Sequence, residues 1–274
     1  MLAFAVAFFA AALPNAVVLQ PVANMYSKPT EDADVVSQAV YGTNVAILEQ
    51  KSGWANIRTP DEYTGWAPLT ALKAAEPYAA SGKVAQVQSL FAHLYREQSV
   101  TKHAPLLTVP FETKLEVTAR PQERWLEVRL ANGRTAFVQA GDVSLNASML
   151  STADMLALSR KFLGLPYTWG GTSSFGYDCS GFMQMLERRR GVNMPRDAQP
   201  QADWSGVEPV DRKNLEPGDL LYFGSSPKRI THTGMYLGEG KFINATTYIT
   251  PMVRIDDLNE EHWTRLLVAM RRVK

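Results

Sequence analysis

The stretch from Tyr177 to Phe182 reads YDCSGF and holds the only cysteine of the 274-residue chain. Glycine-rich sequence precedes it, and apolar residues with helical spacing, such as Phe182 and Met185, follow it. This pattern predicts a helix from Cys179 to Arg189. A thiol at the start of a helix lies at the positive end of the helix dipole, which lowers the pKa of a cysteine. The position therefore favours a reactive nucleophile over a small buried core residue.

A histidine and an asparagine downstream complete a candidate catalytic set. His232 begins a predicted strand with small neighbours, and Asn244 follows twelve residues later, beyond the turn at 238–240. The two side chains share a sheet face only if the hairpin between them has an odd loop or a bulge. In that geometry Asn244 would hydrogen-bond the imidazole and fix its tautomer, while His232 would act as the base for Cys179.

The sequence around these residues indicates an α+β domain over residues 149–274. A helix is predicted over residues 154–163, before Gly164. Strands are predicted at residues 219–223, 233–237, 242–245 and 266–271. Helices followed by an antiparallel sheet are typical of the α+β class.

Two segments ahead of this domain look like degenerate copies of one another. WANIR at residues 54–58 and YTGWA at 63–67 correspond to WLEVR at 125–129 and RTAFV at 134–138, an offset of 71 residues. Short alternating runs separated by turns predict small antiparallel β-barrels. The first is placed at residues 17–76 and the second at residues 77–148.

Composition argues against several classes of function. The formal net charge of +1 gives no general attraction to nucleic acid or anionic membranes, so neither a nucleic-acid partner nor a stable membrane anchor is expected. One cysteine cannot form an internal disulfide or a CxxC site, and the four histidines lack HExxH spacing, so no metal and no cofactor is expected. The basic run at 188–190 is interpreted as a solvated helix end.

The first thirteen residues, MLAFAVAFFAAAL, are apolar and uncharged. They are too short to span a bilayer but match the apolar region of a secretory signal, although the first basic residue is Lys28. Residues 1–16 are therefore interpreted as a signal-like segment, which would place the protein in the periplasm or outside the cell. The alternative is a buried core segment in a cytoplasmic protein.

Several motifs within residues 150–274 together resemble the NlpC/P60 family of papain-like cell-wall peptidases. They are LPYTWGG at 165–171, DCSG at 178–181, PGDL at 217–220 and HTGMY at 232–236. The resemblance implies a papain-like catalytic domain with Cys179 as nucleophile, His232 as base and Asn244 as orienting residue, a position where many members carry a second histidine. It also implies that Tyr167 helps to bind the oxyanion.

The two preceding modules resemble bacterial SH3 domains, and the combination resembles the γ-D-glutamyl-L-diamino acid endopeptidases of this family. The resemblance implies that the first module walls the cleft and that Tyr63, before its Gly-Trp pair at 65–66, helps to hold the free N-terminus of the substrate. Asp178 and Ser180 would share this task, with Asp34 as an acidic residue of the first module. The implied substrates are peptidoglycan stem peptides, L-Ala-γ-D-Glu-diamino acid, with lysine or diaminopimelate left open.

Alternatives to this interpretation remain open. The chain could be a non-catalytic wall-binding protein, which would be favoured if Cys179 were buried or if the Cys-His-Asn geometry were not formed. It could also be a papain-like acyltransferase. A serine acylase would rest on the SxxK match at 225–228, but no KTG motif follows. For Asp178, the alternative role is a helix N-cap.

Overall fold

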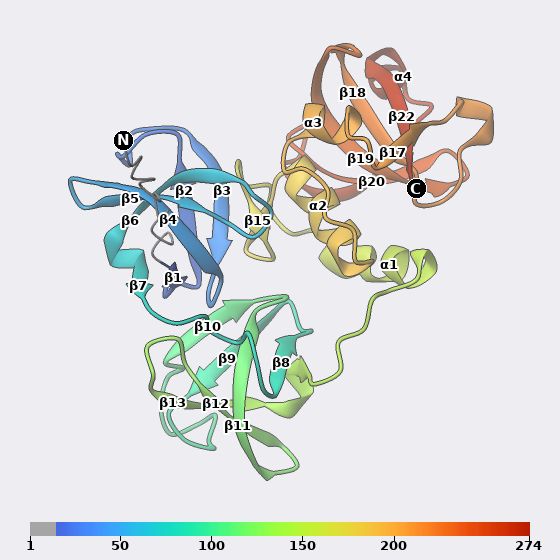
Figure 1. The fold of residues 1–274 in the computed structure, drawn as a ribbon. Helices are drawn as coiled ribbons and strands as arrows, with labels where there is room; N and C mark the ends of the chain where they lie inside the picture. Colours follow the sequence, from blue (N-terminus) through green and yellow to red (C-terminus); the bar gives the residue numbers. More distant parts are fainter. Residues whose placement is uncertain (1–14) are drawn as a thin grey trace, which may run out of the picture.

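The computed structural model describes residues 15–274, arranged as two β modules and an α+β domain (Figure 1). The signal-like segment predicted over residues 1–16 lies outside the described residues, apart from its last two. Those two residues, Asn15 and Ala16, begin strand β1 of the first module. Within residues 15–274, no helix combines the length and the apolar character needed to cross a membrane.

The first module is a seven-stranded antiparallel sheet whose alternating side chains enclose a small core. Its strands pair in the order β3-β2-β6-β5-β4-β1-β7. Alternate residues along β2 and β5 are buried, as expected for strands that cover a core with one face. The strands are β1 (Asn15–Val18), β2 (Val22–Tyr26), β3 (Val35–Val40), β4 (Asn44–Lys51), β5 (Trp54–Arg58), β6 (Thr64–Pro68) and β7 (Leu72–Ala74).

The second module repeats the first strand for strand. Its order, β10-β9-β13-β12-β11-β8-β14, is that of the first module with seven added to each number. An edge-to-face aromatic pair also recurs, Tyr26 with Trp54 and Tyr95 with Trp125. The strands are β8 (Val84–Val87), β9 (Phe91–Tyr95), β10 (Leu107–Pro110), β11 (Lys114–Gln122), β12 (Trp125–Arg129), β13 (Thr135–Gln139) and β14 (Val143–Ser144).

The modules differ from the predicted barrels in one respect. Among the described residues, no ladder joins β3 to β7 or β10 to β14, so each sheet keeps two edges instead of closing. Sequence alternation reports which face of a strand is buried, but closure depends on strand tilt and stagger, which alternation does not encode.

The α+β domain places helices against a six-stranded antiparallel sheet in the order β17-β22-β18-β19-β20-β21. Helix α2 packs on β19 and β20. The helices are α1 (Thr152–Ser159), α2 (Cys179–Arg189), α3 (Ala198–Ala202) and α4 (Glu261–Leu266). The strands are β15 (Thr172–Ser173), β16 (Gly176–Tyr177), β17 (Val207–Pro209), β18 (Leu220–Ser226), β19 (Arg229–Gly238), β20 (Lys241–Thr246), β21 (Met252–Asp257) and β22 (Leu267–Val273).

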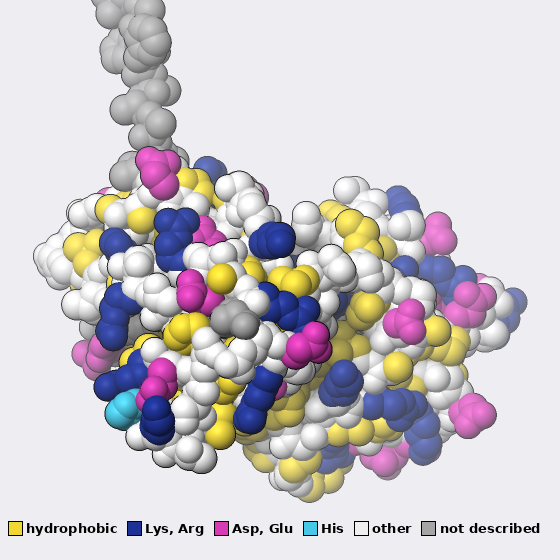
Figure 2. Space-filling view, turned by 90° about the horizontal axis from the view of Figure 1, so that it is seen from below, with side chains coloured by type: hydrophobic (Ala, Val, Ile, Leu, Met, Phe, Trp, Pro, Cys, Tyr) yellow, Lys and Arg dark blue, Asp and Glu magenta, His cyan; other side chains and the backbone are white. Residues whose placement is uncertain are grey.

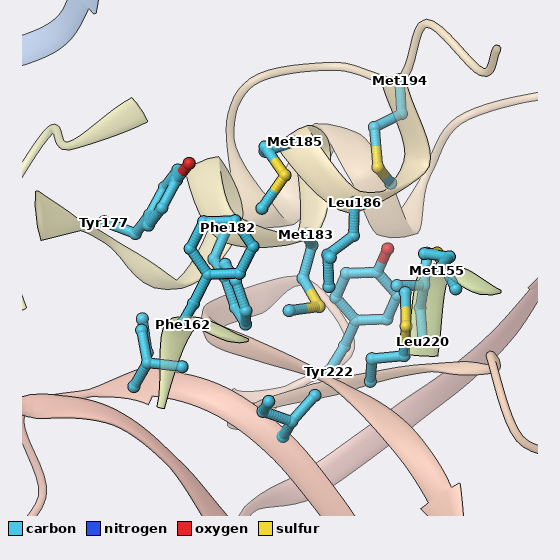
Figure 3. Packing of buried hydrophobic residues seen from close by; sticks show 14 of the residues in the cluster. Met155, Phe162, Tyr177, Phe182, Met183, Met185, Leu186, Met194, Leu220 and Tyr222 are labelled. Atoms are coloured by element: carbon cyan, nitrogen blue, oxygen red, sulfur yellow. The ribbon is translucent and has the colours of Figure 1, made fainter. Parts of the chain in front are cut away.

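The core of this domain lies between α2 and the sheet (Figure 3). Phe182, Met185 and Leu186 of α2 are fully buried, in agreement with the apolar face predicted for this helix. Phe162, which follows α1, contacts Phe182 edge-to-face. Burying side chains of this size stabilises the fold by about 1.5–3 kcal/mol each, so the core fixes the start of α2 firmly against the sheet.

The domain contacts both modules, and the basic run at 188–190 takes part. Arg188 forms an ion pair with Glu112 of the second module, at 2.6 Å between Nη2 and Oε2. Arg189 is almost fully buried and donates from Nη1 to Gln86 Oε1 at 2.8 Å. The interpretation of this run as a solvated helix end is therefore wrong for Arg189, which the second module covers, whereas the Arg188 side chain is 40% exposed and that of Arg190 is partly exposed. Elsewhere basic and acidic side chains are interspersed on the surface (Figure 2).

Candidate active site

Cys179 is the first residue of α2, and the chain before it holds this helix start tightly. Asp178 caps the helix, since its Oδ1 accepts from the backbone N–H of Gly181 at 2.7 Å. Gly181 lies so close to the preceding loop that a Cβ would sit 2.2 Å from the carbonyl oxygen of Gly171. Only glycine fits this approach. The geometry sets the thiol against β19, beside the backbone of Thr233.

His232 and Asn244 meet as the sequence predicted, with 2.9 Å between His232 Nε2 and Asn244 Oδ1. The hairpin between their strands contains a register shift between Tyr236 and Gly238. This irregularity is the bulge that an even separation requires if both side chains are to share one face. The predicted pairing of base and orienting residue is therefore present.

The hydrogen bonds of Asn244 determine the tautomer of His232. The Asn244 amide donates from Nδ2 to Asp256 Oδ2 at 2.9 Å and to the carbonyl of Arg254 at 3.3 Å. Its Oδ1 therefore faces the imidazole as an acceptor, and His232 Nε2 must carry the proton. The other ring nitrogen, Nδ1, is left with a lone pair and can accept a proton from a thiol.

Aromatic rings hold the imidazole in this orientation. Trp263 of α4 stacks on His232 with 5.3 Å between ring centroids, and Phe223 of β18 lies at 5.6 Å. Burial lowers the pKa of His232 to about 4, and the hydrogen bond that His232 donates to Asn244 opposes this shift. The base is therefore neutral at physiological pH.

The Cys179 thiol behaves differently from the sequence-based expectation. A lowered pKa was predicted from the helix dipole, but burial and the adjacent Asp178 carboxylate raise the pKa of Cys179 to about 12. Cys179 is only 7% exposed, so loss of solvation outweighs the dipole. The resting site thus contains a neutral thiol and a neutral imidazole. By the criterion given above, this burial favours the non-catalytic alternative, whereas the His232–Asn244 contact favours a catalytic role.

Tyr167 lies near the nucleophile on a loop tied to the sheet. Its backbone N–H donates to the carbonyl of Pro251 at 3.3 Å, and the Cys179 thiolate and Asp178 contribute to raising the pKa of its hydroxyl, after burial. The hydroxyl therefore remains a hydrogen-bond donor at all physiological pH values, as an oxyanion ligand requires.

Asp178 and Ser180, predicted to bind a substrate ammonium, are instead occupied by Arg196. The Arg196 guanidinium is 3% exposed. It donates from Nη2 to Asp178 Oδ2 at 2.5 Å, from Nη1 to Ser180 Oγ at 2.9 Å, and from Nε to Ser37 Oγ of the first module at 3.2 Å. Arg196 therefore neutralises the carboxylate beside the nucleophile and links the first module to the start of α2.

We expect Arg196→Met to lower the free energy of unfolding by about 3–5 kcal/mol, because it leaves the Asp178 carboxylate buried without its partner. Urea denaturation followed by tryptophan fluorescence measures this. Adding Asp178→Asn, which keeps a capping side chain, should recover much of the loss. Strictly additive effects of the two substitutions would show that the two groups do not act as a pair.

Tyr63 reaches the catalytic domain from the loop between β5 and β6. Its hydroxyl donates to Asp197 Oδ2 at 3.0 Å. Burial, followed by the charge of Asp197, raises the pKa of Tyr63 to about 12. The two residues line a cavity of about 270 Å³ between the first module and the loop before α3. The carboxylate next to Tyr63 is thus that of Asp197, not of Asp178.

Asp34, proposed from the sequence as a further acidic ligand, is exposed at the edge of the first module. Its carbonyl accepts from the Ser27 N–H. Within residues 15–274 its carboxylate makes no hydrogen bond or ion pair, and the structure does not join it to Tyr63 and Asp197. In the same described range, no group of three or more His, Cys, Asp or Glu side chains is arranged to hold a metal ion.

Sequence reasoning missed four residues of the site: Arg196, Asp197, Asp256 and Trp263. Arg196 and Asp197 belong to the run PRDAQPQ at 195–201, whose adjacent charges before a short helix could have drawn attention to it. Asp256 lies on β21, a strand that was not predicted. For Trp263, a lone aromatic residue in a short helix gave no signal.

Comparisons with known proteins agree with this geometry. Residues 164–272 match the NlpC/P60 family and residues 25–72 match the bacterial dipeptidyl-peptidase SH3 domain. A gamma-D-glutamyl-L-lysine dipeptidyl-peptidase of Bacillus cereus is 31% identical over 226 residues, covering 76% of this chain and 66% of that protein. One of Bacillus subtilis is 28% identical over 251 residues, covering 88% and 82%.

The fold is shared as well. The crystal structure of an NlpC/P60 family protein from Bacillus cereus superposes with a TM-score of 0.82 at 25% identity, covering 94% of this chain and 99% of that one. Together, the matched segments, the relatives and the shared architecture of modules and catalytic domain show that this chain belongs to the NlpC/P60 family, with a bacterial SH3 domain ahead of its catalytic domain.

Proposed function

We propose that this chain is a cysteine endopeptidase that hydrolyses the γ-D-Glu–diamino acid bond of cell-wall peptides with a free N-terminal L-Ala. The observation that carries the proposal is the His232–Asn244 pair, because His232 directly precedes Thr233, whose backbone contacts Cys179. Tyr63 of the first module reaches the same domain through its hydrogen bond to Asp197. The names of the Bacillus relatives, gamma-D-glutamyl-L-lysine dipeptidyl-peptidases, support the bond and the peptide class.

The geometry supports general-base activation of the thiol. His232 Nδ1 takes the proton of Cys179 as the sulfur attacks the γ-carbonyl carbon. The neutral thiol, imidazole and carbonyl thereby become an imidazolium and a tetrahedral adduct with a new C–S bond and a negative oxygen. The oxyanion lies near the Tyr167 hydroxyl and the N–H groups of the first turn of α2, which have no partner within the helix. The imidazolium then donates its proton to the leaving amine, and water hydrolyses the remaining thioester.

The ammonium of the substrate is assigned to Asp197 and Tyr63. Arg196 already occupies Asp178 and Ser180, whereas Asp197 has one carboxylate oxygen bonded to Tyr63 and another available. A cation is the natural ligand for a partly buried carboxylate beside a hydroxyl. Because Tyr63 belongs to the first module, that module would limit the space beyond the ammonium and select for a short N-terminal segment, the L-Ala and D-Glu of a stem peptide.

We expect the enzyme to cleave free L-Ala-γ-D-Glu-Lys about 10²-fold more efficiently than its N-acetylated form. Acetylation removes the charge that Asp197 binds, and charged hydrogen bonds contribute about 1.5–3 kcal/mol, or roughly 10–10²-fold. The acetyl group would also meet Tyr63. The measurement is kcat/KM for both peptides with products identified by mass spectrometry.

Two variants test this prediction further, one in the catalytic domain and one in the second module. Asp197→Asn should reduce the preference for the free amine to a few-fold. Arg134→Ala should leave the preference for the free amine unchanged. Arg134 occupies the position in the second module that corresponds to Tyr63, and the second module takes no part in the proposed ammonium site. Equal rates on the two peptides would refute the ammonium site, and failure to cut either peptide would refute the proposed bond.

A further inference from the structure

A second pocket lies on the catalytic domain, between the segment after β20 and helix α4. It has a volume of about 380 Å³ and is lined by Tyr248, Glu260, Glu261, His262 and Arg265. Within residues 15–274, none of these side chains has a hydrogen-bond or ion-pair partner. The pocket thus contains two carboxylates and a guanidinium that are free to bind a ligand.

This pocket adjoins the catalytic residues through two separate contacts. His262 packs edge-on against Trp263 at 4.7 Å between centroids, and Trp263 stacks on His232. In addition, Tyr248 belongs to the segment that reaches Pro251, whose carbonyl accepts from Tyr167 beside the nucleophile. Both routes connect the pocket to residues of the candidate active site, His232 and Tyr167.

The pocket and the ammonium site lie on different sides of the catalytic domain. Tyr63 and Asp197 lie where the first module meets this domain, whereas α4 lies on the side remote from that module (Figure 1). If the N-terminus of a peptide binds at Asp197 and its scissile bond lies at Cys179, the residues after that bond extend away from the first module, in the direction of α4.

The lining suits a side chain with a long apolar stem and a cationic end. Tyr248 and His262 are stacked face to face, with 3.7 Å between centroids and 8° between planes, so the two rings form one rigid aromatic unit in the pocket lining, against which methylene groups can pack. Glu260 and Glu261 offer carboxylates to an ammonium, and Arg265 offers a guanidinium to a carboxylate of the same residue.

We propose that this pocket is the subsite for the residue after the scissile bond, and that Glu260 and Glu261 bind the terminal ammonium of its side chain. The inference rests on the proposed function and adds to it the residues that recognise the diamino acid. Lysine and diaminopimelate both carry this ammonium, and diaminopimelate adds a distal carboxylate within reach of Arg265.

The test compares tripeptides that differ only in their third residue. We expect wild-type kcat/KM for L-Ala-γ-D-Glu-Lys to exceed that for the norleucine analogue, which lacks the ammonium, by about fivefold, because the glutamates are exposed and such pairs contribute modestly. In Glu260→Gln/Glu261→Gln this ratio should fall to about one. The diaminopimelate peptide is assayed beside the lysine peptide in the wild type and in Arg265→Gln. If the enzyme prefers diaminopimelate, this substitution should lower kcat/KM for the diaminopimelate peptide and leave that for the lysine peptide unchanged.

The matched control is Glu123→Gln/Glu208→Gln, which also removes two carboxylate charges, but from exposed positions away from the pocket. This variant should keep the fivefold ratio of kcat/KM between the lysine and norleucine peptides. A wild-type ratio of one, or a ratio that survives the Glu260/Glu261 substitutions, would overturn the subsite while leaving the proposed function standing. If neither peptide is cut, the proposed function fails and this inference fails with it.

Discussion

Replacement of Cys179 by alanine is expected to lower kcat for L-Ala-γ-D-Glu-Lys by at least about 10⁴-fold, the largest effect of any single substitution in this chain. The proposed reaction has no other nucleophile: the chain has one cysteine, and the hydroxyl of the neighbouring Ser180 is held by Arg196. Rates are measured with the purified variant, with product detected by mass spectrometry.

The substitution should leave the fold intact, so that loss of rate reports on chemistry. Cys179 is small and buried at the edge of the core, and its removal affects neither the cap formed by Asp178 nor the Arg196 ion pair. Thermal unfolding within a few degrees of wild type serves as the control. A variant that folds and still turns over substrate would show that the thiol is not the nucleophile.

Local sequence signals predicted the helix that begins at Cys179 and the contact between His232 and Asn244. The predicted bounds of α2, Cys179 to Arg189, agree with the structure, because loop glycines, a capping aspartate and apolar spacing all lie within one short stretch. The need for a bulge between His232 and Asn244 followed from strand periodicity alone, and the bulge is present. The same reasoning identified the repeat of the two modules.

Features that depend on tertiary approach could not be predicted in this way. Arg196 pairs with a residue 18 positions earlier and with Ser37 of another module, and no local pattern encodes such contacts. The pKa of Cys179 illustrates the same limit. The helix dipole can be inferred from sequence, but the burial that outweighs it depends on how β19 and the loops close around the thiol.

The role of Asp178 shows that sequence can locate a residue while missing its main partner. Its position before the nucleophile suggested both a helix cap and an ammonium ligand, and the cap is present. The second role stays a prediction, and the sequence reasoning did not include the pairing of the carboxylate with Arg196. The acidic residue beside Tyr63 is Asp197, which is adjacent in sequence to the arginine that occupies Asp178.

The second large effect is expected for His232→Ala, which should reduce kcat by at least about 10³-fold, since the thiol would lose its only nearby base. With the pKa of the thiol raised to about 12, almost no thiolate exists at neutral pH without proton transfer to the imidazole. Alkylation by iodoacetamide provides an independent readout, because every modified molecule carries the label on Cys179. The alkylation rate at pH 7 should decrease together with kcat.

Two further measurements identify His232 as the base: the pH dependence of activity and the effect of replacing Asn244. Burial lowers the pKa of His232 to about 4, so the neutral, base-competent form exists above that pH and activity should fall only as the pH decreases through about 4. Asn244→Ala should cost less, about 10–10³-fold, because Asn244 orients the ring without taking a proton. Two outcomes would contradict this division of roles. An acid limb near the ordinary histidine value of about 6.5 would place the imidazole in solvent. An Asn244 variant as inactive as His232→Ala would make the orienting amide part of the proton transfer itself.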